Sequence, residues 1–224
     1  MKFAVKIVLV VFFLGMCVQA YSQVKDAGLW TSISLKKDLK NDFQLSADFE
    51  SRRNENLAEM DGAFVDLSLK RKLSKHFDVA ANYRFGNKRE LDNSYSLRQR
   101  WSLDLSTDYQ VWEFKVQYRS RFQLNQKDLQ SEERRLGYQS GWRNKFSAEI
   151  KLFKKTELDV AVELFLSEDE ESWYLSDIRY ATAISYKLKK RQYLKVGFIY
   201  QRELQTDNPL FEYITTIGYS LELK

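Results

Sequence analysis

The feature that most constrains the fold is an alternation of apolar and polar residues that recurs along most of the chain. In one such segment Phe114, Val116 and Tyr118 alternate with Lys115 and Gln117. A period of two is typical of a β-strand with two unlike faces, and no stretch of twelve residues after the N-terminal segment has the period of an amphipathic helix. Charged residues make up 30% of the chain and aromatics 15%, so we expect these two classes to occupy opposite faces of a sheet.

A lysine-rich turn recurs four times, each time followed by an alternating segment. It is "LKKDLKNDFQLS" from Leu35, "LKRKLSKHFDVA" from Leu69, "IKLFKKTELDVA" from Ile150 and "YKLKKRQYLKVG" from Tyr186. The repeat therefore predicts a series of β-hairpins whose tight turns share one end of the molecule.

Eleven strands are predicted, and the connections between them alternate in length. The strands are 27–36, 42–53, 60–72, 77–86, 96–107, 110–123, 135–153, 157–167, 173–189, 192–204 and 211–223. Short turns are predicted near 37–41, 73–76, 108–109, 154–156 and 190–191. Longer loops are predicted near 54–59, 87–95, 124–134, 168–172 and 205–210.

The lengths of these strands favour a membrane barrel. Strands of globular proteins have about five or six residues, whereas a membrane-spanning strand needs about 9–11. Aromatic residues also gather near both strand ends, as they do at a membrane interface. We therefore predict an all-β fold: an antiparallel transmembrane β-barrel of about 10–12 strands, with short periplasmic turns and longer extracellular loops. A soluble secreted barrel or sandwich, with its apolar face inward, is the alternative.

The strand count raises a question of parity. Single-chain bacterial barrels usually have an even number of strands. Either residues 27–36 do not span the membrane, which leaves ten strands, or a bend in 135–153 or 173–189 hides a twelfth.

The N-terminal segment resembles a secretory signal peptide. Lys2 and Lys6 precede an apolar run, and small residues allow cleavage after 20 or 22. Cys17 suggests a lipoprotein, but Met16 is large for a lipidation site. We predict a signal peptide over 1–22 and one outer-membrane barrel domain over 23–224, in a Gram-negative bacterium.

The residue inventory argues against most enzymes. His76 is the only histidine, it falls in a predicted short turn, and the predicted mature chain has no cysteine. We expect no enzymatic activity, no cofactor and no metal site. The net charge of +5 is not that of a nucleic-acid-binding protein. Glu168 to Glu171 could bind a divalent cation, but they lack the spacing of a calcium loop, so a solvated loop is expected.

The expected partners are therefore those of the envelope. They are outer-membrane lipid and lipopolysaccharide, and the barrel-assembly machinery during insertion.

The candidate functional residues are the charged residues in the polar phase of the strands. They are Arg98, Arg100, Arg119, Arg121, Arg143, Glu157, Asp159, Glu163 and Arg179. In a narrow barrel such side chains should pair and fill the lumen. This favours a salt-bridged, mostly plugged lumen and a structural or envelope-interaction role. The alternative is a narrow channel for small solutes, with a polarised path between a basic and an acidic cluster. The basic cluster would be Arg98, Arg100, Arg119, Arg121 and Arg143, and the acidic cluster Glu157, Asp159 and Glu163.

Two segments carry a resemblance to a known family. "LWTSISLKKDLKNDFQLSADFESRRN" and "VDLSLKRKLSKHFDVAANYRFGNKRE" resemble the start of the domain of unknown function 2490 family of Bacteroidota outer-membrane proteins. The resemblance implies an outer-membrane barrel over essentially the whole predicted mature chain, and it implies no catalytic residue and no particular function.

Overall fold

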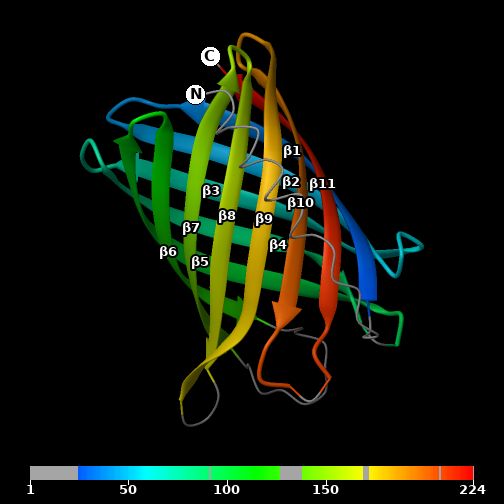
Figure 1. Cartoon of the computed structure of the whole chain (residues 1–224). Helices are drawn as coiled ribbons and strands as arrows, with labels where there is room; N and C mark the ends of the chain where they lie inside the picture. Colours follow the sequence, from blue (N-terminus) through cyan, green and yellow to red (C-terminus); the bar gives the residue numbers. More distant parts are fainter. Residues whose placement is uncertain (1–24, 91, 127–137, 169–171, 207, 224) are drawn as a thin grey trace.

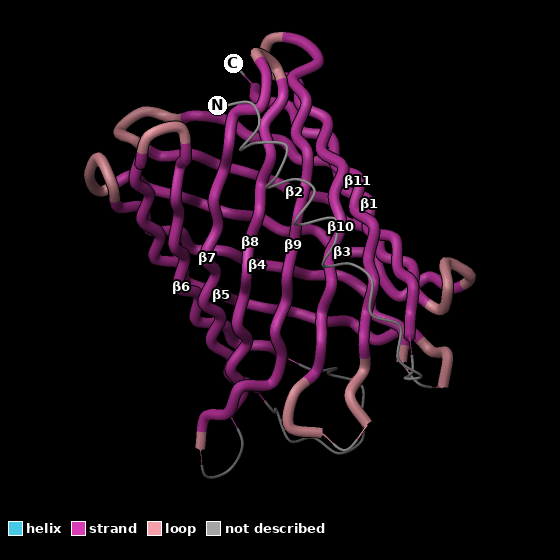
Figure 2. The backbone as a smooth tube through the Cα atoms, in the orientation of Figure 1, coloured by secondary structure: helices cyan, strands magenta, loops and turns pink. Residues whose placement is uncertain are grey.

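The alternating segments form eleven β-strands. The computed structural model describes residues 25–90, 92–126, 138–168, 172–206 and 208–223. The strands are β1 (Lys25–Asp38), β2 (Phe43–Asn54), β3 (Glu59–Lys72), β4 (Phe77–Arg89), β5 (Tyr95–Val111), β6 (Phe114–Gln126), β7 (Tyr138–Phe153), β8 (Thr156–Glu168), β9 (Trp173–Lys189), β10 (Gln192–Glu203) and β11 (Phe211–Leu223). Figure 2 shows strands joined by loops, and no helix among the described residues could span a membrane. The predicted signal peptide lies outside these residues.

The strands close into one barrel, as Figure 1 shows. Each strand pairs antiparallel with its neighbour in sequence, and β1 closes the barrel by pairing with β11. This last pair is parallel, with a register that runs from Lys25 opposite Phe211 to Lys37 opposite Leu223. When the strand number is odd, the first and last strands of a hairpin series point the same way, so the closing pair must be parallel.

The parity question is thus answered against both suggested alternatives. The first strand is part of the barrel wall, so the count is not ten. The long β7 and β9 strands hide no twelfth strand but carry register irregularities near Leu152, Ser176 and Leu188.

The tight turns follow the lysine-rich repeat with one correction. Asn41 and Asp42 both have positive φ, of 59° and 62°, as the favoured two-residue hairpin turn requires. The turn predicted at 108–109 is wrong, because β5 continues to Val111 and the chain reverses at Trp112, where φ is 54°. Tyr109 therefore extends the pleat of β5, and its ring packs against His76 in the neighbouring turn.

The apolar face of the sheet points outward. Leu103 is 60% exposed and Phe146 53% exposed, whereas the polar neighbour Asp104 is 7% exposed. This is the reverse of a soluble barrel, in which the apolar phase would fill the interior. The polar phase lines the lumen and positions the candidate site.

Candidate functional site

The charged residues predicted for the lumen share the phase of the most buried polar side chains. Glu163 on β8 is 4% exposed, the least of any charged residue in the described part of the chain. In the strand register it lies between Lys145 on β7 and Arg179 on β9. Strand pairing therefore surrounds this carboxylate with cations on both sides.

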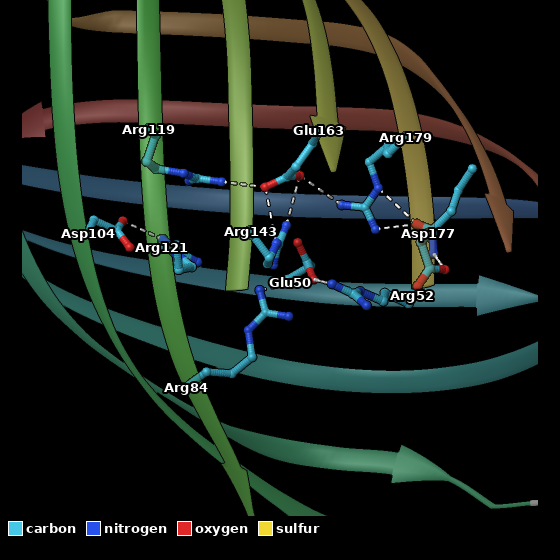
Figure 3. A network of polar contacts seen from close by, with 11 residues as sticks. Glu50, Arg52, Arg84, Asp104, Arg119, Arg121, Arg143, Glu163, Asp177 and Arg179 are labelled. Carbon is cyan, nitrogen blue, oxygen red and sulfur yellow. Dashed lines mark hydrogen bonds and ion pairs between the residues drawn. The ribbon is translucent and has the colours of Figure 1, made fainter. Parts of the chain in front are cut away.

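Glu163 is the centre of an ion-pair cluster, drawn in Figure 3. Its carboxylate oxygens lie 2.8 Å from Arg119 Nη2, 2.9 Å from Arg143 Nη2 and 3.7 Å from Arg179 Nη1. Arg143 also donates from Nε, at 3.1 Å. Three guanidinium groups from β6, β7 and β9 thus share one carboxylate from β8.

A second group of ion pairs lies on the wall formed by β2, β3 and β4. Arg84 Nε donates to Asp66 at 2.7 Å, and its Nη2 lies 3.5 Å from Glu50. Arg52 binds the same Glu50 oxygen at 2.6 Å. Arg52 of this group and Arg179 of the Glu163 cluster lie over the same Trp30 ring, so the two groups meet inside the barrel.

Arg121 on β6 binds Asp104 on β5 through two hydrogen bonds. Its Nε and Nη2 donate to the two oxygens of Asp104, at 2.6 and 2.7 Å. This two-bond arrangement is the strong form of an arginine–carboxylate contact.

Aromatic rings extend the ion pairs across the lumen. Trp30 on β1 lies between two guanidinium groups, 3.9 Å from Arg52 and 5.3 Å from Arg179. Phe165 on β8 similarly faces Arg143 at 4.5 Å and Arg179 at 4.8 Å. Arginine over an aromatic face is attractive, and more so when water is excluded.

The third ring belongs to Phe64 on β3, which faces Arg52 and Arg84, both at 5.1 Å. It is 6% exposed. We call the seven residues that form these contacts the arginine–aromatic layer: Arg52, Arg84, Arg143, Arg179, Trp30, Phe64 and Phe165.

Glycine makes room for Phe64. Its register partner is Gly86, where an added Cβ would lie 2.1 Å from the carbonyl oxygen of Ala63 and 2.7 Å from Cα of Phe64. At Gly62 a Cβ would meet the Phe64 ring at 2.9 Å. The ring therefore lies flat against backbone that only glycine leaves clear.

The three residues of the predicted acidic cluster do not act together in the structure. Glu163 lies among arginines, whereas Asp159 lies nearer the tight turns and binds Lys195 at 2.9 Å. Glu157 pairs in register with Lys151, one step closer to the turn.

The predicted basic cluster is divided in the same way. Arg98 leaves it for the long-loop end, where it binds Glu90. Ser96 and then Arg98 hold the pKa of Glu90 below its ordinary value by donating hydrogen bonds to its charged form. Arg100 hydrogen bonds to Asn125 at 2.5 Å, and within the described residues no carboxylate lies at ion-pair distance from it.

Sequence reasoning missed the three rings of the layer. Each ring stands in the polar phase: Trp30 alternates with serines, Phe64 precedes Asp66 by two residues, and Phe165 follows Glu163 by two. A large aromatic residue at a position where the alternation predicts a polar, lumen-facing side chain could have identified each of these rings.

His76 is half-buried in the β3–β4 turn. It stacks on Tyr109 with a centroid distance of 4.5 Å, and its Nδ1 lies 2.7 Å from the Asp108 carbonyl oxygen. These contacts tie the β3–β4 turn to the end of β5.

The metal-ligating residue types do not gather in the described part of the chain. No group of three or more histidine, cysteine, aspartate or glutamate side chains there could hold a metal ion. Of the acidic loop, residues 169–171 lie outside the described residues.

Comparison with known proteins gives a family and no activity. The model of the family described as Protein of unknown function (DUF2490) matches residues 27–211, which include β1 without its first two residues, all of β2 to β10, and the first residue of β11. No curated protein matches the chain.

Proposed function

Because the chain belongs to the DUF2490 family, whose description states no activity, we propose its function from the geometry of the barrel. The protein is a small outer-membrane barrel of a Gram-negative bacterium. Its lumen is mostly plugged by the arginine–aromatic layer, and its role is structural or envelope-interacting, exercised through the long loops.

The outer face supports residence in a membrane. Large apolar side chains cover it, such as Ile33, Leu105 and Phe146, each more than half exposed. A soluble protein rarely leaves so extensive an apolar surface in water, while a spanning barrel requires one. Closure of the sheet also satisfies the backbone hydrogen bonds that hydrocarbon cannot.

Aromatic rings with polar ends form a belt on this face. The contacts run from Tyr83 to Trp101, from Phe122 through Trp142 to Trp173, and from Tyr180 through Tyr200 to Tyr213. Such amphipathic rings suit a membrane–water interface. We place the long-loop end of the barrel, toward which these rings lie, outside the cell, and the lysine-rich turns in the periplasm.

The partners follow from this placement. Outer-membrane lipid and lipopolysaccharide would contact the outer face, and the barrel-assembly machinery would insert the chain. The position of His76, held in a tight turn by Tyr109 and Asp108, supports a protein without histidine-based catalysis.

One observation carries the plugged lumen: Arg179 lies over the Trp30 ring although its strand is not a neighbour of β1. Arg179 is on β9, Trp30 on β1, and β10 and β11 lie between them in the sheet. The contact therefore crosses the interior rather than following the wall. Continuous side-chain contact leaves little room for a solute in a barrel of this size.

Bilayer conductance of the purified, heat-modifiable protein tests the proposal. The wild type is expected to give no steady conductance, and a Trp30→Ala/Arg179→Ala variant is expected to open a resolvable pore. Lys195→Ala, which removes a lumenal cation outside the layer, is the matched control and should stay closed. Steady, well-resolved conductance of the wild type would overturn the proposal.

A narrow channel for small solutes is the second candidate. It is favoured by partly exposed cations in the lumen: 27% of the Arg119 side chain and 49% of that of Lys195 remain accessible. This candidate predicts wild-type conductance whose ion selectivity changes on Arg119→Ala. A silent bilayer removes it.

A further inference from the structure

Arg100 is a lumenal arginine without a carboxylate at ion-pair distance among the residues that the structure describes. Its hydrogen bond, from Nε, goes to the neutral side chain of Asn125. The strongest electrostatic neighbours of its guanidinium are four other guanidinium groups, those of Arg84, Arg143, Arg52 and Arg121. Three of its neighbours share their carboxylates with other cations: Arg84 and Arg52 both bind Glu50, and Arg143 shares Glu163.

The strand register places positively charged residues opposite each other on the wall formed by β4 to β7. Arg84 lies directly opposite Arg100, Arg121 opposite Arg143, and Arg119 opposite Lys145. Like charges directly opposite on one face of a sheet are destabilising. The first of these pairs joins β4 to β5, and the other two are successive pairs between β6 and β7. Four of the five arginines bind a carboxylate: Arg84 binds Asp66, Arg121 binds Asp104, and Arg119 and Arg143 bind Glu163. Arg100 is therefore the arginine of these pairs that the described carboxylates leave unmatched.

The donors are suited to an anion with several oxygens. Guanidinium groups bind phosphate, sulfate and carboxylate through paired N–H donors. The Nη groups of Arg100 have no hydrogen-bond partner among the described residues. The Arg100 side chain is only partly buried, so an ion in lumenal water can reach it.

We propose that the lumen binds one small oxyanion, of the inorganic phosphate or sulfate class, at Arg100 against the facing guanidinium of Arg84. The bound anion offsets the repulsion between the paired arginines, and it completes the charge balance that the protein's own carboxylates leave open. This site is additional to the proposed plug, and it does not depend on whether the barrel conducts.

The test is equilibrium dialysis of the full mature protein in detergent micelles against radiolabelled phosphate and, separately, sulfate. Ionic strength is held constant with chloride. Saturable binding of about one ion per barrel is expected for the wild type. Arg100→Gln should weaken it at least tenfold, which is the effect of losing a charge-assisted hydrogen bond.

Lys195→Gln is the matched control, because it removes a lumenal cation that Asp159 already pairs, and binding should be unchanged. Folding of each variant is checked by heat-modifiable migration. Absence of saturable binding to folded wild type overturns the inference, and so does unchanged affinity in folded Arg100→Gln. If Arg100→Gln does not fold, Arg100→Lys, which keeps the charge but loses the paired donors, should bind more weakly and decides the matter. Conductance is measured separately, so a conducting barrel that binds phosphate would reject the plug and retain the site.

Discussion

Replacing Glu163 with glutamine removes the charge that three arginines share, with almost no change in volume. The Glu163 side chain is 6% exposed, and the side chains of Arg143 and Arg179 are 12% and 16% exposed, so little water can take over its role. Removing one partner of a buried ion pair costs about 3–5 kcal/mol. Because Arg119 remains more accessible, we expect the low end, about 3 kcal/mol, or roughly a hundredfold in the unfolding equilibrium.

Asp159→Asn provides the matched control. Asp159 also pairs with a lumenal cation, Lys195, but the two side chains are 30% and 49% exposed. An exposed pair contributes about 0–1 kcal/mol. The expected difference between the two variants is therefore about 2 kcal/mol or more, although both remove one lumenal carboxylate charge.

The assay is urea-induced unfolding in lipid vesicles, followed by tryptophan fluorescence and by heat-modifiable migration. Glu163→Gln should shift the midpoint strongly at an unchanged slope, since the exposed surface does not change. If Glu163→Gln and Asp159→Asn are destabilised equally, the cluster does not act as a buried unit, and the reasoning from burial fails.

Three further predictions concern the packing of the barrel wall, the closing β1–β11 pair and the long-loop end. Gly86→Ala should destabilise the barrel by about 1–3 kcal/mol, because the added Cβ meets backbone atoms. Gly218→Ala is the control and should destabilise the barrel less, because its Cβ meets only the movable Ser32 hydroxyl. A denaturant midpoint shifted equally in both variants would contradict this. Thr31→Cys/Ile217→Cys should form a disulfide on oxidation, because the two residues are opposite each other in the parallel β1–β11 pair. The control Thr31→Cys/Leu221→Cys should not form one, because its second cysteine is displaced by about 13 Å along the strand. The opposite outcome on non-reducing gels would reject parallel closure. Because the folded pKa of Glu90 is lowered, its contribution to stability is complete above its unfolded pKa of about 4.3 and is lost as the pH falls through the lower folded value. Hydrogen-exchange protection factors near Ser96, which correct for the intrinsic pH dependence of exchange, should therefore fall below about pH 4 in the wild type. An equal fall in Glu90→Gln would argue against the role of Glu90.

Local pattern alone determined the wall of this barrel. Because side chains alternate strictly between the two faces of a strand, the phase of Arg119, Arg143 and Glu163 could be predicted without knowing any partner. The tight turn at Asn41 and Asp42 was equally local, since these residue types tolerate positive φ.

The closure and the content of the lumen were decided by the tertiary structure. Parallel pairing of β1 with β11 joins residues about 190 apart in the sequence, and no periodicity within either strand specifies it. The sequence suggested separate basic and acidic clusters, but the register places Glu163 among three arginines and Asp159 beside Lys195. Contacts such as Arg179 with Trp30 cross the interior, so they depend on how the tilted walls face each other once the sheet is closed. The sequence thus determined which residues line the lumen, and only closure of the sheet decided which of them meet.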